Sequence, residues 1–295
     1  MALASPPPAS LLARRVHFDW LDRETDQWHH TLPEFGAAAN AISLLMPHAE
    51  PYVIAQVRAG LSSADSPSDE LRSTVDVWAK QEGAHFRAHR DFNRSLCSAS
   101  RTARVLDSFG KRIFASLSKR SPAFGLAFAA AFEIVAFCAA RWAESGLRRY
   151  FTGADERSAS LFLWHLAEEI EHKGIAHDVM AQSKQARKKY KVAVVVAFAV
   201  LIGFTVVGGL SLFARRASVF NPIRWARLVA WGFSFAFVVM PVVSSSMAKD
   251  FHPDQLVDPP WMAQWLREFD PVSQTLPLWT EAGTGLSSLQ HQAAA

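Results

Sequence analysis

The motif Glu-x-x-His occurs twice in the chain, first as Glu82 to His85 and again as Glu169 to His172. Because residues three apart share one face of a helix, each pair directs a carboxylate and an imidazole toward the same point. A further acid, Glu133, is the only charged residue of a mostly apolar segment of eighteen residues. An isolated buried carboxylate is costly unless it is protonated, paired or bound to a cation. The chain must therefore bring a compensating charge to these acids.

The acids and histidines follow a recognisable order. From the N-terminus, the predicted metal ligands are Glu50, Glu82, His85, Glu133, Glu169 and His172. One Glu from each of two helices and one Glu-x-x-His from each of two others form the ligand set of ferritin-like dinuclear carboxylate proteins. Glu34 is an alternative to Glu50, and Glu168 is an alternative to Glu169, although only Glu169 has the three-residue spacing to His172.

This ligand set indicates the kind of metal. Four carboxylates neutralise two divalent ions, and two imidazoles leave coordination positions open for dioxygen or water. Oxygen-rich ligation without a thiolate suits iron or manganese better than a closed zinc site. The expected cofactor is a pair of Fe ions, with Mn or Zn as alternatives.

Three further residues fall near the predicted ligands. His89 follows Glu82 by seven residues, and His165 and Glu168 lie on the helix of the second motif. We expect His89, His165 and Glu168 to serve catalysis by handling protons or by orienting ligands through hydrogen bonds. The two histidines could instead be additional ligands or core residues. His177 follows His172 by five residues and should point elsewhere.

The remaining pattern predicts an all-α fold. Val, Ile and Thr form no alternating strand-like runs, and polar residues precede the expected helix starts. The expected helices span about 32–46, 47–59, 66–96, 99–119, 121–150 and 155–183. Long helices with short links favour an antiparallel bundle. Together with the ligand set, they predict a ferritin-like four-helix bundle with an appended apolar helical hairpin.

The hairpin consists of two uncharged segments, 192–214 and 228–248. At about 1.5 Å per residue, each reaches the roughly 30 Å core of a bilayer. Basic residues lie in the link and at the outer ends, and their distribution weakly favours cytoplasmic outer ends. We expect membrane association, on the cytoplasmic side of the inner membrane, or a cytoplasmic location. The alternatives are two buried core helices or a hairpin that enters one leaflet.

The expected organisation has four parts: a flexible N-terminal lead (1–30), the dinuclear-metal bundle (31–185), the hairpin (186–250) and a C-terminal tail (251–295). The net charge of +4 with no concentrated basic face argues against nucleic-acid binding. Two cysteines are too few for a disulfide framework or a cysteine-based zinc site.

Three motifs carry a resemblance to a known family. They are Pro47-x-x-Glu50, then Glu82-x-x-His85-x-x-x-His89, and the stretch Trp164-His-x-x-Glu-Glu-x-Glu-His172. At these residues, and over about 30–250, the chain resembles the bacterial family of predicted metal-dependent hydrolases. One departure is that His48 and Ala49 stand where a small or glycine-like residue is expected. The resemblance implies hydrolysis.

The ligand pattern leads us to expect a di-iron, dioxygen-activating oxidoreductase that acts on a hydrophobic or lipid-like substrate and receives electrons from a donor. A second hypothesis is a dinuclear metal-dependent hydrolase that uses a metal-bound hydroxide. A third is a non-catalytic, metal-binding, membrane-associated bundle. We also consider that two copies of the chain form a homodimer.

Overall fold

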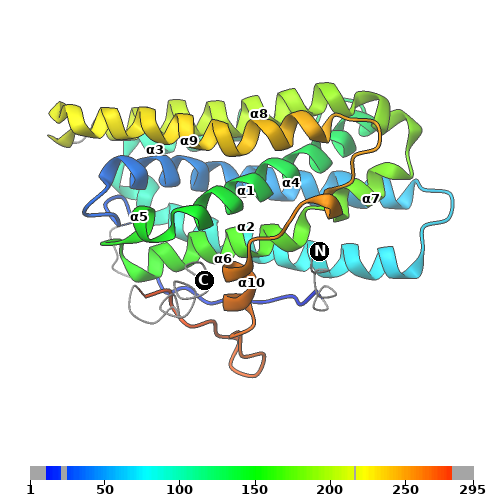
Figure 1. The fold of residues 1–295 in the computed structure, drawn as a ribbon, viewed down its shortest axis with the longest axis horizontal. Helices are drawn as coiled ribbons and strands as arrows, with labels where there is room; N and C mark the ends of the chain where they lie inside the picture. The colour runs from blue at the N-terminus through cyan, green and yellow to red at the C-terminus, as the bar shows by residue number, and fades with distance from the viewer. Residues whose placement is uncertain (1–10, 21–24, 216, 281–295) are drawn as a thin grey trace, which may run out of the picture.

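The computed structural model describes residues 11–20, 25–215 and 217–280. Its long helices run side by side along the longest axis of the molecule (Figure 1). Within the described residues there is no strand, only two isolated bridges, which pair His29 with Ala154 and Asp270 with Thr275. The prediction of an all-α fold is confirmed.

The bundle that carries the predicted site is formed by α1 (Pro33–Ser62), α2 (Asp69–Ala99), α4 (Pro122–Ser145), α6 (Glu156–His172) and α7 (Ile175–Ala181). The helix α3 (Arg101–Leu117) connects α2 to α4, and the short α5 (Leu147–Phe151) follows α4. Side chains of Ser68, Ser121 and Asp155 accept hydrogen bonds from backbone N–H groups of the first turns of α2, α4 and α6. These caps explain why α4 and α6 start where the sequence predicted. The helix α2 begins three residues later than predicted, because Ser68 and not Ser66 is its cap.

One helix replaces the two that were expected at 32–46 and 47–59, because α1 continues through Pro47 and Pro51. A proline removes the hydrogen bond to the carbonyl four residues earlier, which for Pro47 is the carbonyl of Ser43. That carbonyl instead accepts a hydrogen bond of 2.7 Å from the side-chain amide of Asn93 on α2. The partner from a neighbouring helix keeps α1 unbroken. The helix expected at 155–183 is divided into α6 and α7 at Lys173 and Gly174.

The hairpin is formed by α8 (Lys184–Phe213) and α9 (Pro222–Ser246), joined through the short helix η1 (Ala217–Phe220). The helix α8 packs along α1 and α4, and α9 packs on α4. Within the described part of the chain, three helices, α4, α8 and α9, are long and apolar enough to cross a membrane by length and composition. Most of α4 is buried in the bundle, whereas α8 and α9 each leave one face exposed.

The described part of the expected flexible lead packs onto the bundle, which differs from the prediction. Arg14 and Trp28 are buried, and the backbone carbonyl of Trp28 accepts a hydrogen bond from Asp155 N. Residues 1–10 and 21–24 of that lead lie outside the described residues. The described tail includes η2 (Pro253–Gln255) and α10 (Pro260–Leu266), and it reaches α6 where Trp279 N donates to Ser160 Oγ.

Candidate metal centre

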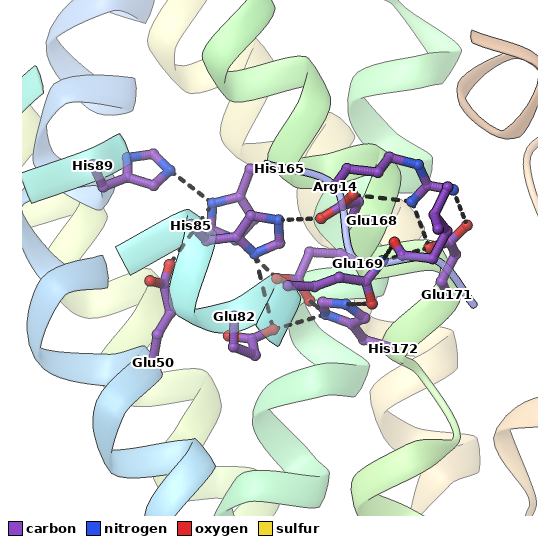
Figure 2. A network of polar contacts seen from close by, with 12 residues as sticks. Arg14, Glu50, Glu82, His85, His89, His165, Glu168, Glu169, Glu171 and His172 are labelled. Atoms are coloured by element: carbon purple, nitrogen blue, oxygen red, sulfur yellow. Dashed lines mark hydrogen bonds and ion pairs between the residues drawn. The ribbon is translucent and has the colours of Figure 1, made fainter. Parts of the chain in front are cut away.

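The structure brings all nine predicted site residues together inside the bundle. Figure 2 labels all of them except Glu133. Glu50 comes from α1, Glu133 from α4, and the two Glu-x-x-His motifs from α2 and α6. The nine residues are buried, and His165, at 7% exposure, is the least buried of them. Four helices thus contribute to one interior cluster, as the order of the residues in the sequence predicted.

The first group within this cluster combines the two Glu-x-x-His motifs. Glu82, His85, Glu169 and His172 each offer a ligand atom, and these atoms lie within 4.8 Å of one another. Nδ1 of His172 is 2.8 Å from Glu82 Oε1 and 3.6 Å from Glu169 Oε2. Glu133 Oε2 lies 3.9 Å from the same nitrogen. The two motifs therefore face each other across one small volume.

A second group lies beside it. Glu50, His89 and His165 also offer ligand atoms within 4.8 Å of one another, and Nδ1 of His165 is 3.8 Å from Glu50 Oε1. The other nitrogen of His165, Nε2, is 2.8 Å from Glu169 Oε1. His165 thus connects the two groups, and it lies between the acid of α1 and an acid of the second motif.

Many of the oxygen and nitrogen atoms that could bind a metal have no hydrogen-bond partner. Among the described residues, no hydrogen bond reaches eight buried side-chain atoms of these six residues: Glu50 Oε1 and Oε2, Glu82 Oε1, His85 Nδ1, Glu133 Oε1 and Oε2, Glu169 Oε2 and His172 Nδ1. His172 Nδ1 and Glu82 Oε1 are close, but they do not have hydrogen-bond geometry. Each buried polar atom without a partner costs about 1–3 kcal/mol. Bound divalent cations would satisfy these atoms, so the residues fit a metal site.

The charges at the centre support the same conclusion. Burial, together with the neighbouring carboxylates of Glu82 and Glu169, raises the pKa of Glu50 and of Glu133 well above the ordinary value. Burial would also raise the pKa of Glu169, but interactions with His165 and His172 outweigh it and bring that pKa well below the ordinary value. Without added positive charge, the centre cannot hold all four carboxylates ionised.

The imidazole of His85 is oriented from outside the centre. Its Nε2 lies 2.9 Å from Glu168 Oε2, so it donates to that carboxylate and leaves Nδ1 as a lone pair toward the centre. The other oxygen of Glu168 accepts from Arg14 at 2.9 Å, and Arg14 also donates twice to Glu171 (Figure 2). Burial and His165 lower the pKa of His85, which keeps the ring neutral and suitable as a ligand.

His172 is oriented in the same way by an amide. Its Nε2 lies 3.2 Å from Gln81 Oε1, and the amide nitrogen of Gln81 donates to Glu171 at 2.8 Å. Because Arg14 also binds Glu171, the hydrogen bonds form one continuous chain from His85 to His172. Both imidazoles present Nδ1 to the centre.

A second chain of hydrogen bonds begins where Pro47 frees the Ser43 carbonyl. The side-chain nitrogen of Asn93 donates to that carbonyl, so the amide oxygen of Asn93 is the atom that faces Ser43 Oγ. This oxygen, Oδ1, accepts a hydrogen bond from Ser43 Oγ at 2.8 Å. Ser43 Oγ must then accept from His89 Nδ1 at 2.8 Å, and His89 Nε2 accepts from His165 Nδ1 at 2.7 Å. The remaining nitrogen of His165 contacts Glu169 at 2.8 Å. Both ring nitrogens of His165 therefore face acceptors, His89 Nε2 and Glu169 Oε1.

Sequence reasoning missed Arg14, Gln81, Glu171, Ser43 and Asn93. Glu171 stands within the third motif, and Gln81 directly precedes Glu82, so adjacency to ligands was the available signal. The other three carry no local signal, because their partners come from distant parts of the chain.

The structure also shows where the two alternative ligands, Glu34 and Glu168, lie. Glu34 pairs with Arg224 and Arg227 at the start of α9 and lies outside the centre. Glu168 contacts Arg14 and His85, whereas Glu169 contacts His165 and His172.

Two other histidines also lie outside the centre. His48 pairs with Asp107 on α3. His177 lies in a separate cluster with Asp178 and His252.

Comparisons with known proteins identify the family. The family model described as predicted metal-dependent hydrolase matches residues 12–256. No curated protein and no solved structure matches the chain. The match overturns our expectation of a di-iron, dioxygen-activating oxidoreductase and favours the hydrolase alternative. Together with the buried His and Glu clusters it indicates dependence on metal ions. The chain belongs to the family of predicted metal-dependent hydrolases.

Proposed function

We propose that the chain is a hydrolase whose centre holds two divalent metal ions. The ligands would be Glu50, Glu82, His85, Glu133, Glu169 and His172. The observation that carries the proposal is the set of buried donor atoms on these residues that no hydrogen bond satisfies within the described part of the chain. Four carboxylates balance the charge of two divalent ions, which supports that number. The oxygen-rich donor set leaves iron, manganese and zinc as candidates.

Cations bound at such a donor set lower the pKa of water and polarise the bond to be cleaved. The residues of the chain would divide the remaining work. Glu168 and Gln81 hold the imidazoles of His85 and His172 with Nδ1 toward the centre. His165 would hold a proton on each ring nitrogen and could donate the one at Nε2 to a leaving group. His89 would keep His165 in this orientation.

The side chains around the centre favour an apolar substrate. The ring centroids of Trp164 and His85 are 4.7 Å apart, and those of Trp78 and His172 are 6.3 Å apart. Phe162 lies 5.8 Å from His89. Aromatic surroundings would stabilise the apolar part of an ester better than a charged group. We therefore propose a hydrophobic ester as the substrate class.

The test combines metal analysis with hydrolysis assays on the full chain. Metal content would be measured as purified, after chelation and after reconstitution with iron, manganese or zinc. The assays would use p-nitrophenyl esters with short and long acyl chains. We expect hydrolysis that is lost on chelation and restored by one of the metals, and that favours the longer chains. Hydrolysis that survives complete metal removal would contradict the proposal.

Substitution provides the matched control. Glu133→Ala and His172→Ala should each lower metal content to half or less and abolish hydrolysis. His48→Ala, which changes a residue of α1 that contacts Asp107, should leave both unchanged. Full metal content in both Glu133→Ala and His172→Ala would show that these residues are not ligands.

A further inference from the structure

The helices α8 and α9 lie along one long side of the molecule and leave an apolar face uncovered (Figure 1). We call this the hairpin face and define it by the exposed residues Val195, Val207, Phe220, Val229, Phe233 and Phe237. Phe233 is 74% exposed and Phe237 is 84% exposed. Burying one such side chain in an apolar phase is worth about 1.5–3 kcal/mol. Exposed apolar side chains gathered on neighbouring helices in this way mark an interaction surface.

The charged residues within the segment that forms α8, η1 and α9 are all basic. Residues 184–249 contain ten Lys or Arg and no Asp or Glu. Two of the arginines pair with Glu34, whereas the lysines of the first turns of α8 are exposed. Lys188 precedes Val195 by seven residues, so both lie on the same line along the helix. The apolar face therefore ends in a basic cluster, which is the pattern of helices that bind anionic lipid.

The packing of α8 decides how the hairpin face would meet a bilayer. The helix α3 runs beside α8, and Phe109 stacks on Phe204 with ring centroids 6.1 Å apart. The exposed face of α3 carries Arg104, Lys111 and Arg112. If α8 crossed a bilayer, these residues would enter the hydrocarbon at about 2.5–3.5 kcal/mol for each charge near the centre. A spanning orientation is therefore unfavourable.

We propose that the hairpin face docks in the plane of an anionic lipid bilayer, with α8 and α9 parallel to the membrane surface. The apolar side chains would enter the outer part of one leaflet, and the lysines of α8 would contact anionic headgroups. The proposal does not depend on the hydrolytic function.

A second copy of the chain fits the hairpin face less well. Pairing two such faces in a parallel or an antiparallel arrangement would bring basic ends against basic ends. The segment offers no acidic residue of its own to compensate them. An anionic bilayer supplies the missing charge of opposite sign.

The first experiment is flotation of the full chain with lipid vesicles. We expect co-flotation with vesicles of phosphatidylglycerol and phosphatidylethanolamine, and weaker binding to phosphatidylcholine vesicles or at high salt. The double variant Phe233→Asp and Phe237→Asp should bind at least about tenfold more weakly. Val257→Asp, at a residue that is 75% exposed but lies outside α8 and α9, is the matched control and should bind normally. Unchanged flotation of the double variant would overturn the proposal.

The second experiment distinguishes docking from spanning. A Cβ added at Gly203 or Gly232 would meet no atom within 4 Å, so cysteines at these mid-helix positions accept spin labels. Labels at Val192→Cys and Phe220→Cys report the two ends, in a Cys97→Ser background that leaves only the buried Cys138. Docking predicts similar depths at all four positions. Depths that are greatest at 203 and 232 would overturn the proposal in favour of spanning. A stable dimer that does not float and is dissociated by the Phe233 and Phe237 variant would also overturn it.

Discussion

Nε2 of His85 lies 2.9 Å from Glu168 Oε2, while no described residue gives the Nδ1 atom of the same ring a hydrogen bond. The carboxylate thus determines which nitrogen carries the proton and which one is free. Glu168 would act through His85, because its own oxygens are already engaged by His85 and Arg14. Substitution of Glu168 therefore tests the orientation of His85 without removing a metal ligand.

Glu168→Gln should weaken metal binding by about 10–100-fold without unfolding the protein. Glutamine keeps the shape of the side chain but is a weaker acceptor for His85 Nε2, so the ring loses part of its orientation and basicity. The measurement is a metal titration with a competing chelator. Glu156→Gln, at an exposed position in the first turn of α6, is the control and should bind metal normally. Equal affinities in the two variants would contradict the role of Glu168.

Arg14→Met should destabilise the protein by about 3–5 kcal/mol, because it leaves the buried Glu168 without its cation. Burial raises the pKa of Glu168, and Arg14 opposes that shift. The double variant Arg14→Met with Glu168→Gln has no unpaired buried charge at this position. It should therefore be more stable than the single Arg14→Met variant. Urea denaturation of the wild type, the two single variants and the double variant tests this coupling, and strictly additive losses would rule it out.

The part of the site that could be predicted was encoded in local spacing. Two Glu-x-x-His motifs and an isolated acid in an apolar helix were enough to predict which side chains meet. Arg14 could not be found in this way, because its contact with Glu168 joins residues 154 positions apart. The unbroken α1 was missed for a related reason, since the partner that replaces the lost hydrogen bond at Pro47 is Asn93 of another helix.

The hydrogen bonds that start at Asn93 predict the protonation of two histidines in the metal-free protein. His89 should carry its proton on Nδ1, and His165 should carry protons on both nitrogens. Asn93→Leu leaves the Ser43 carbonyl without its donor and Ser43 Oγ without its acceptor, so His89 should no longer be held in one tautomer. Nitrogen NMR of the imidazoles reports these states directly. A single unchanged tautomer of His89 in Asn93→Leu would contradict the chain of hydrogen bonds.

Metal binding should release protons and should strengthen as the pH rises. Burial raises the pKa of Glu50 and Glu133, so these carboxyls keep protons above the ordinary value of 4.5 in the metal-free protein. For His172, the effect of Glu169 and Glu82 exceeds that of burial and raises its pKa well above 6.5, so this imidazole also loses a proton to become a ligand. Calorimetry in two buffers of different ionisation enthalpy measures the release. An affinity that is constant between about pH 5 and pH 8 would contradict the prediction.

The contact of α8 with α1 depends on a residue without a side chain. A Cβ at Gly209 would lie 3.0 Å from Ala38 Cα and 3.3 Å from Ala38 Cβ, and the backbone of α1 cannot move away as a flexible side chain would. We expect Gly209→Ala to destabilise the protein by about 1–3 kcal/mol, because α8 must shift from α1. Gly203→Ala lies on the same helix with no atom within 4 Å of the added Cβ, and it should stabilise the protein by up to about 1 kcal/mol through helix propensity. Chemical denaturation of both variants measures the difference, and Gly209→Ala as stable as Gly203→Ala would show that α8 does not pack closely on α1.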